Sequence, residues 1–220
     1  MKTIKVWDLF VRFFHWSLVI AVISQLATAE DFKTVHVRVG YVIIALLILR
    51  IVWGFVGSRY ARFKDFIYPP ADILAYLKGL LQGRPRHYTG HNPAGGAMVC
   101  ALLIFLLATT LSGLMTYRAH GKGPLALQSR QMVASAWAHD TNHRDEDERS
   151  QHDESNNRAE DRHSHGPAEA RINFWKDIHE SLVGISLTLI VLHICGVIAS
   201  SYVHRENLIL AMITGKKQSH

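Results

Sequence analysis

The chain has 220 residues, of which 49% are hydrophobic, and a formal net charge of +6 at pH 7. This length suits one domain, and the hydrophobic residues gather in long uncharged runs, which indicates membrane-spanning helices and argues against a water-soluble core. The two cysteines, Cys100 and Cys195, fall inside such runs, so we expect packed thiols and exclude a disulfide framework of the kind found in secreted domains.

The first two hydrophobic runs lie close together in the chain. They cover residues 13–28 and 36–56, and a short polar turn at 30–33 joins them. The second run contains Arg38 and Arg50, one near each end, where a long cationic side chain can reach the lipid headgroups. We predict two antiparallel membrane-spanning helices.

The first run also resembles a cleavable signal peptide, because basic residues precede it and Ala-Thr-Ala follows at 27–29. Against cleavage, the segment ahead of it already holds Trp7 and other large hydrophobic residues, and the run contains His15. Cleavage would also leave an odd number of spans. We expect the segment to be retained, which the mass of the intact purified chain would establish.

Residues 57–93 follow the second run and are rich in Arg and Pro. Within them, hydrophobic residues at helical spacing after Pro69-Pro70 predict a short helix at 72–81. This helix either lies on the membrane surface with Lys78 toward water or packs beneath the membrane-spanning helices. The residues that give the spacing are Ile73, Leu77, Leu80 and Leu81.

The two strongest candidates for spanning helices come later in the chain. Residues 93–117 and 181–204 contain no Asp, Glu, Lys or Arg, and about 20 residues suffice to cross the hydrocarbon core. We predict an all-α, integral membrane four-helix bundle. Residues 1–117 would hold helices one to three, and 173–220 would hold helix four and a tail.

Residues 118–172 differ in kind, because they mix ten acidic with eight basic residues and six histidines. Such a segment cannot bury a core, so we expect a long flexible external loop. The alternative is a loop that captures a metal ion through spaced His, Asp and Glu. Its histidines are His120, His139, His143, His152, His163 and His165.

The charges indicate the orientation in the membrane. Segments 1–12, 50–93 and 204–220 hold thirteen basic and four acidic residues, whereas the rest of the chain holds eleven basic and fourteen acidic ones. Basic residues collect on the cytoplasmic side of inserted helices. We therefore expect both termini in the cytoplasm of a bacterial inner membrane, and no nucleic-acid partner.

Four histidines in or beside the spans fall into two layers. His36 and His179 stand where the second and fourth helices enter from the external side. His15 precedes the end of the first run by 13 residues and His193 follows His179 by 14, which places both about 20 Å deeper. Fourteen residues also return a helix to within about 40° of its starting direction. We name His36 and His179 the outer pair, and His15 and His193 the inner pair.

Each pair can provide two imidazoles to one iron porphyrin, leaving the iron six-coordinate and suited to electron transfer. Attachment would be non-covalent, since C-x-x-C-H is absent. Alternatives are a hydrogen bond to a neighbouring helix or a zinc or copper site, although the layers are too far apart for one ion. His91 and His204 are possible substitute ligands, but their depth matches no partner.

Haem propionates need cations near each membrane face. Arg12 lies three residues before His15, and Arg38 lies two residues after His36. We expect each arginine either to pair with a propionate or to extend toward the headgroups.

Several motifs resemble bacterial cytochrome b561 proteins, the group that includes the cytochrome b subunits of nickel–iron hydrogenases. The resemblance covers the whole chain except for roughly residues 118–170. The resemblance implies a four-helix inner-membrane bundle with two b haems on helices one, two and four, matching His15, His36, His179 and His193. The motifs are Val6-Trp7-Asp8, Val11-Arg12, Phe14-His15-Trp16, Val35-His36-Val37, Gly90-His91-Asn92-Pro93-Ala94-Gly95-Gly96, His204-Arg205-Glu206-Asn207-Leu208 and Ala211-Met212-Ile213-Thr214-Gly215.

The resemblance further implies electron transfer between the quinone pool (ubiquinone or menaquinone) and an external redox partner, such as a cytochrome c or a hydrogenase. One alternative is superoxide oxidation that delivers electrons to quinone, for which cations near the outer pair would steer the anion. Another is a haem-free membrane protein that binds metal through the loop histidines. A b-type absorption band in the reduced sample separates the last from the others.

Overall fold

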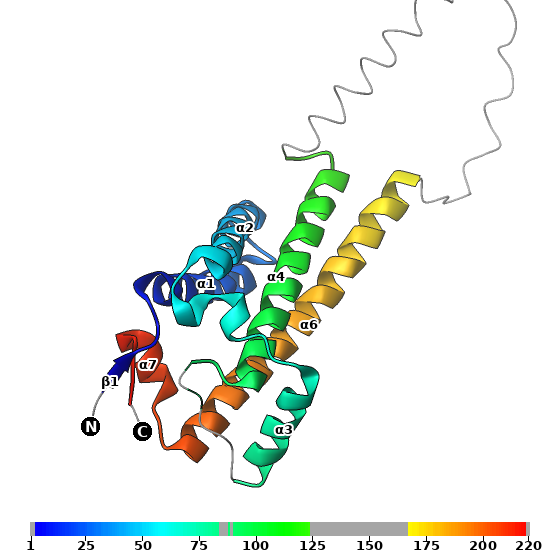
Figure 1. Ribbon diagram of the computed structural model, residues 1–220. Helices are drawn as coiled ribbons and strands as arrows, with labels where there is room; N and C mark the ends of the chain where they lie inside the picture. The colour runs from blue at the N-terminus through cyan, green and yellow to red at the C-terminus, as the bar shows by residue number, and fades with distance from the viewer. Residues whose placement is uncertain (1–2, 84–87, 89, 124–166, 219–220) are drawn as a thin grey trace, which may run out of the picture. The chain divides into compact units, whose positions relative to one another are not determined.

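The computed structural model describes residues 3–83, 88, 90–123 and 167–218. It divides into two compact units, Met1–Leu111 with Glu180–His220 as the first and Ser112–His179 as the second. Four helices are long and hydrophobic enough to cross a membrane (Figure 1), which confirms the all-α membrane architecture. They are α1 (Leu9–Thr28), α2 (Lys33–Val56), α4 (Pro93–Ala119) and α6 (Pro167–His204).

Three of the helices begin earlier than their hydrophobic runs, and α2 does so by three residues. The α1 helix starts at Leu9, because the carboxylate of Asp8 accepts a hydrogen bond from the backbone N–H of Val11 at 2.7 Å and caps the first turn. The α6 helix starts at Pro167, and proline fits a first helical position because its missing N–H is not needed there. The predicted loop at 118–172 therefore contributes to helices at both ends, and its residues 124–166 lie outside the described part.

The first unit has a core built from one face each of α1, α2 and α4. Across the described part of α4 and α6, the hydroxyl groups of Thr109 and Ser186 lie 2.9 Å apart and join these helices. Ser186 is only 4% exposed, so this contact satisfies a polar group between apolar helices. The buried core residues are Phe14, Ala21, Ile43, Leu47, Leu103 and Leu106.

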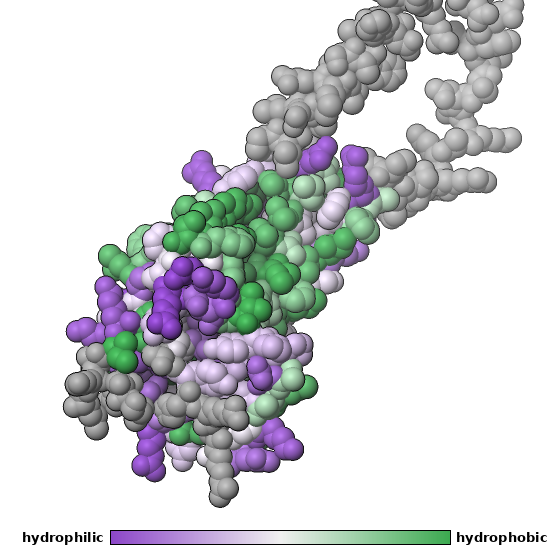
Figure 2. Space-filling model, in the orientation of Figure 1, coloured by the Kyte–Doolittle hydropathy of each residue, from purple (hydrophilic) through white to green (hydrophobic). Residues whose placement is uncertain are grey.

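The remaining faces of these helices expose large hydrophobic side chains. Ile20 is 65% exposed, Ile104 64% and Ile198 58%, and Figure 2 shows such residues over much of the visible face. A water-soluble protein does not leave apolar surface of this extent uncovered. A helix satisfies its own backbone hydrogen bonds, so these faces suit contact with hydrocarbon.

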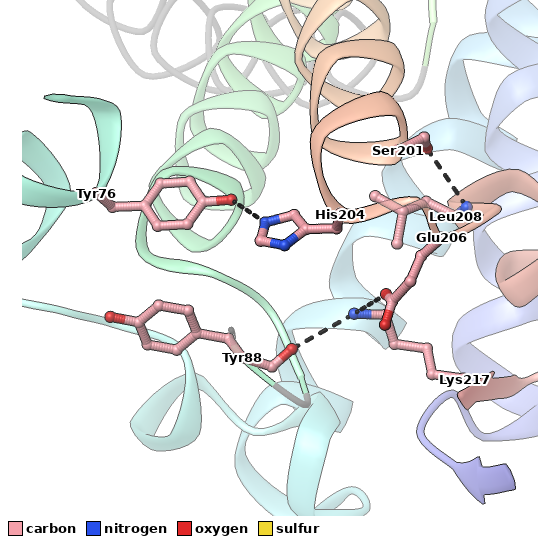
Figure 3. A network of polar contacts seen from close by, with 7 residues as sticks. All are labelled: Tyr76, Tyr88, Ser201, His204, Glu206, Leu208 and Lys217. Atoms are coloured by element: carbon pink, nitrogen blue, oxygen red, sulfur yellow. Dashed lines mark hydrogen bonds and ion pairs between the residues drawn. The ribbon is translucent and has the colours of Figure 1, made fainter. Parts of the chain in front are cut away.

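The segment after α2 forms two short 3₁₀ helices, Arg59–Ala61 and Phe63–Asp65, and then α3 (Pro70–Leu81). Tyr76 of α3 is 5% exposed, and its hydroxyl lies 3.2 Å from Nε2 of His204 at the end of α6 (Figure 3). The α3 helix thus contacts the end of α6, while Leu74 and Lys78 stay exposed, and both expected placements stay predictions.

The two ends of the chain are joined to each other, which the sequence did not predict. Strands β1 (Thr3–Lys5) and β2 (Lys216–Gln218) pair antiparallel beside α7 (Leu208–Thr214), as Figure 1 shows. Gly215 adopts a φ of +79°, and its carbonyl accepts hydrogen bonds from the N–H groups of Val6 and Trp7. A Cβ there would lie 2.7 Å from the carbonyl oxygen of Trp7, so the junction requires glycine.

An ion pair holds the tail to the preceding segment. Nζ of Lys217 lies 3.3 Å from a carboxylate oxygen of Glu206 and donates to the Tyr88 carbonyl at 3.4 Å (Figure 3). The two charged side chains are only 11% and 8% exposed, so solvent screens this pair less than a surface pair.

Asp8 connects α1 to the end of α2. Besides capping α1, its carboxylate accepts hydrogen bonds from Nε1 of Trp53 at 3.0 Å and from the hydroxyl of Ser58. Burial raises the pKa of Asp8, but these hydrogen bonds and the positive charge of Arg50 outweigh burial and hold it below its usual value.

A group whose pKa falls on folding adds stability above its unfolded-state pKa and loses it as pH drops through the folded-state pKa. We therefore expect the thermal stability of the detergent-solubilised chain to fall below about pH 4, near the ordinary Asp value. In Asp8→Asn this part of the pH dependence should be absent, whereas Asp65→Asn, which removes an exposed carboxylate, should retain it. Equal acid dependence of wild type and Asp8→Asn would contradict the role given to Asp8.

Candidate functional site

The inner pair lies within the first unit. His15 is on α1 and His193 is on α6, and the two imidazoles interact electrostatically. Nδ1 of His15 is buried and has no hydrogen-bond partner among the described residues, and its ring meets Trp16 edge-on at 5.3 Å between centroids. An unpaired buried ring nitrogen costs free energy unless a further group engages it.

In the outer pair, His36 is the fourth residue of α2. Its Nδ1 lies 3.2 Å from the backbone carbonyl oxygen of Gln25 on α1. A histidine that coordinates a metal commonly donates its other ring N–H to a carbonyl, which fixes the tautomer and the ring direction. If His36 is a ligand, as predicted, the contact with Gln25 would fix its tautomer and the direction of its ring.

His179 belongs to the second unit, where α4 supplies its neighbours. Its Nδ1 lies 3.1 Å from the hydroxyl oxygen of Ser112, which is 4% exposed. A Cβ added at Gly113 would lie 3.0 Å from Cε1 of the same ring. The α4 helix contains no predicted ligand, but it positions the ring of His179. The hydroxyl of Ser112 contacts the ring, and Gly113, which has no side chain, leaves room for it.

His36 and His179 fall in different units, so the outer pair as a pair stays a prediction. Gln25, Ser112 and Gly113 were not identified from the sequence. Ser112-Gly113 inside an uncharged run was the available signal, since a small polar residue next to glycine often marks close approach between membrane helices.

The two arginines predicted near propionates have different surroundings. Arg12 donates through its guanidinium to the backbone carbonyl of Ile213 on α7, and its Nε is buried with no partner among the described residues. Arg38 is exposed on α2. Both propionate assignments stay predictions.

The two substitute ligands lie in other surroundings than the inner and outer pairs. His204 contacts Tyr76. His91 packs against Trp7 and Phe66, with ring centroids 4.5 and 4.8 Å apart. Burial, together with the positive charges of Arg50, Lys217 and His193, lowers the pKa of His91 to about 3, so its imidazole is neutral at physiological pH.

These residues fit a b-type haem on chemical grounds. Haem iron takes neutral imidazole nitrogens at its axial positions, and the buried Nδ1 of His15 has no hydrogen-bond partner among the described residues. The partners of His36 and His179 match the outer-shell hydrogen bonds that metal-bound histidines use.

Comparison with known proteins agrees with this chemistry. The family model described as prokaryotic cytochrome b561 matches residues 6–215. A probable Ni/Fe-hydrogenase B-type cytochrome subunit of Bradyrhizobium diazoefficiens is 22% identical over 248 aligned positions, covering 98% of this chain and 86% of that protein. No solved structure matches the chain.

Two other relatives match over shorter stretches. The probable Ni/Fe-hydrogenase 1 B-type cytochrome subunit of Escherichia coli K12 is 29% identical over 46% of each chain, and the corresponding Azotobacter vinelandii protein is 32% identical over 40% of each. The chain thus spans just under half the length of the Escherichia coli relative. It belongs to the prokaryotic cytochrome b561 family, as a multi-pass bacterial membrane protein with haem b as its cofactor.

Proposed function

We propose that this cytochrome binds two b haems, one between His15 and His193 and one between His36 and His179, and passes electrons between the quinone pool and an external redox protein. The observation that carries the proposal is the buried, unpaired Nδ1 of His15 within electrostatic range of His193. An imidazole in this position at membrane depth requires a function or a partner.

The chain's own residues determine how such a site works. When bound, haem b supplies a one-electron carrier that alternates between ferric and ferrous iron. Four histidines would hold the two groups, and the carbonyl of Gln25 and the hydroxyl of Ser112 would fix the outer imidazoles. With two side-chain ligands per iron no coordination position would stay open, which would favour electron transfer over oxygen chemistry.

Both layers depend on the spacing along α6. His179 and His193 lie 14 residues apart on this helix, a rise of about 21 Å. Two carriers at these depths provide a route through most of the hydrocarbon, which is about 30 Å thick.

The proposed orientation places both termini in the cytoplasm of the inner membrane. Pairing of β1 with β2 holds the two ends together, which supports a placement of both on the same side of the bilayer. The excess of basic residues in segments 1–12, 50–93 and 204–220 favours the cytoplasm as that side. Quinone would then meet the inner haem and the external partner the outer one.

The names of the relatives indicate the kind of partner. They are described as probable cytochrome subunits of Ni/Fe-hydrogenases. We propose a soluble redox enzyme of this kind as electron donor at the outer face and quinone as acceptor. A cytochrome c at the same face is the other candidate.

Reduction by quinol tests the proposed route. In proteoliposomes that contain the oxidised protein, a membrane-soluble quinol should reduce the haem of wild type, because electron transfer with quinone is reversible. In His193→Ala, which should lack the inner haem, the remaining haem should be reduced at least tenfold more slowly. A wild-type cytochrome that dithionite reduces and quinol does not would contradict a quinone partner.

A further inference from the structure

An arginine is buried inside a membrane-spanning helix of the first unit. Arg50 of α2 is 3% exposed, its Nη1 donates to the carbonyl of Ala61 at 3.2 Å, and its guanidinium lies over the rings of Phe63 and Phe66 at 5.7 and 5.9 Å. One carbonyl uses one of the five N–H donors of a guanidinium. Among the described residues, no carboxylate lies within ion-pair distance of Arg50.

The nearest acidic influence comes from Asp8, whose charge acts on Arg50. The oxygens of Asp8 already accept hydrogen bonds from Val11, Trp53 and Ser58. A buried guanidinium without a bonded carboxylate is costly. Its surroundings therefore suit an anionic group that none of the described residues provides.

A second polar group lies beside this arginine. The ring of His91 is packed against Trp7 and Phe66, and its Nδ1 is buried with no partner among the described residues. The loop that carries it is held in place, because the hydroxyl of Tyr68 donates to the His91 carbonyl at 3.3 Å. The ring is thus held with a polar nitrogen unsatisfied.

Arg50 and His91 both belong to the surroundings of the inner pair. They share contact with the ring of Phe66, and both Arg50 and His193 interact electrostatically with His91. Arg50 lies six residues before the end of α2, and His15 lies six residues after the start of the antiparallel α1. At about 1.5 Å per residue, each is about 9 Å from the same end of the spans.

We infer that Arg50 and His91 form the carboxylate-binding end of the inner haem site, where the guanidinium and the Nδ1–H of His91 hold a haem propionate. This inference rests on the proposed inner haem of His15 and His193. A b haem carries two carboxylates on one edge, and in an apolar setting each requires a cation or a hydrogen-bond donor. Arg50 provides the cation and His91 the neutral donor, adding to the expectation for Arg12.

Redox titration with haem quantification tests the inference. We expect Arg50→Gln to retain two haems per chain but to shift the ferric–ferrous equilibrium of the inner haem about tenfold toward ferric, which is 59 mV for one electron. The loss of a cation beside the propionate leaves more negative charge near the iron and favours its oxidised form. The inner haem is the titration component that disappears in His193→Ala.

Two further variants make the test specific. Arg59→Gln removes an exposed cation from the neighbouring 3₁₀ helix and should leave both haem potentials unchanged. His91→Phe keeps an aromatic ring, slightly larger than imidazole, and removes the ring nitrogens, so it should shift the inner haem a few-fold in the same direction as Arg50→Gln.

The outcomes separate this inference from the proposed function. If Arg50→Gln and His91→Phe each hold two haems with wild-type potentials, Arg50 and His91 do not bind the propionate and the ligand assignment stands. If Arg50→Gln does not insert into the membrane, His91→Phe alone decides, because it keeps an aromatic ring between Trp7 and Phe66. If wild type itself lacks a second haem, the proposed function fails first.

Discussion

Substitution of single histidines on α6 should remove one haem at a time. In His193→Ala the inner haem is lost and the outer one remains, whereas His179→Ala loses the outer haem and keeps the inner one. The reason is depth, because 14 residues of helix separate the two side chains, about 21 Å. Haem per chain, measured as the pyridine complex, should fall from two to one in each variant.

His204→Ala is the matched control on the same helix. This histidine contacts Tyr76 at the end of α6 and should be dispensable for haem content, so the variant should keep both groups. Retention of two haems by either His179→Ala or His193→Ala would show that the ligand assignment is wrong.

Gly113→Val should cause the loss of the outer haem without any change of ligand. A Cβ at this position already lies 3.0 Å from Cε1 of His179, and the two γ-methyl groups of valine bring more atoms toward the ring. Because α4 and α6 are helical here, their backbones cannot shift locally to make room. The imidazole must therefore turn away from its contact with Ser112. We expect the variant to hold one haem per chain, with the spectrum and potential of the inner haem.

Gly184→Val provides the comparison, because a Cβ at Gly184 meets no atom within 4 Å. It makes the same change inside a helix, so both variants carry a similar cost in helix propensity. Two haems in Gly184→Val and one in Gly113→Val would support the steric explanation. Two haems with unchanged potentials in both would exclude it.

The membrane architecture was accessible from the sequence because length and charge determine it. Hydrocarbon excludes Asp, Glu, Lys and Arg, so uncharged runs such as 93–117 coincide with helices that can span it. Helix ends were less accessible, since they depend on caps. Asp8 is polar and so does not appear in the hydrophobic pattern, yet its carboxylate caps α1 by accepting a backbone hydrogen bond from Val11.

Contacts between distant segments could not be predicted. Pairing of β1 with β2 involves three residues on each side, too few for any periodic pattern to appear. The periodicity of α3 predicted its helix but not its buried residue, because Tyr76 is fixed by contacts with Tyr88, Ser200 and His204 rather than by a hydrophobic stripe. The role of Ser112 could not be predicted for the same reason, because it depends on a contact with His179 on another helix.

The depth argument nevertheless reached the candidate site. It selected four of the fourteen histidines from their position along helices. In the structure, Nδ1 of His15 has no hydrogen-bond partner among the described residues, whereas Nδ1 of His36 contacts Gln25 and Nδ1 of His179 contacts Ser112. It missed Arg50, which was interpreted as a residue that reaches the headgroups but is 3% exposed. Position in the sequence does not tell whether a long side chain points outward or inward.

The central claim is that paired imidazoles hold two haems within one membrane-embedded chain. The most direct measurement is the ratio of haem b to protein in the purified wild type, together with its ferric spectrum. We predict two haems per chain, both six-coordinate and low-spin. A well-folded preparation from haem-replete cells that is colourless, or that binds only one haem, would contradict the account.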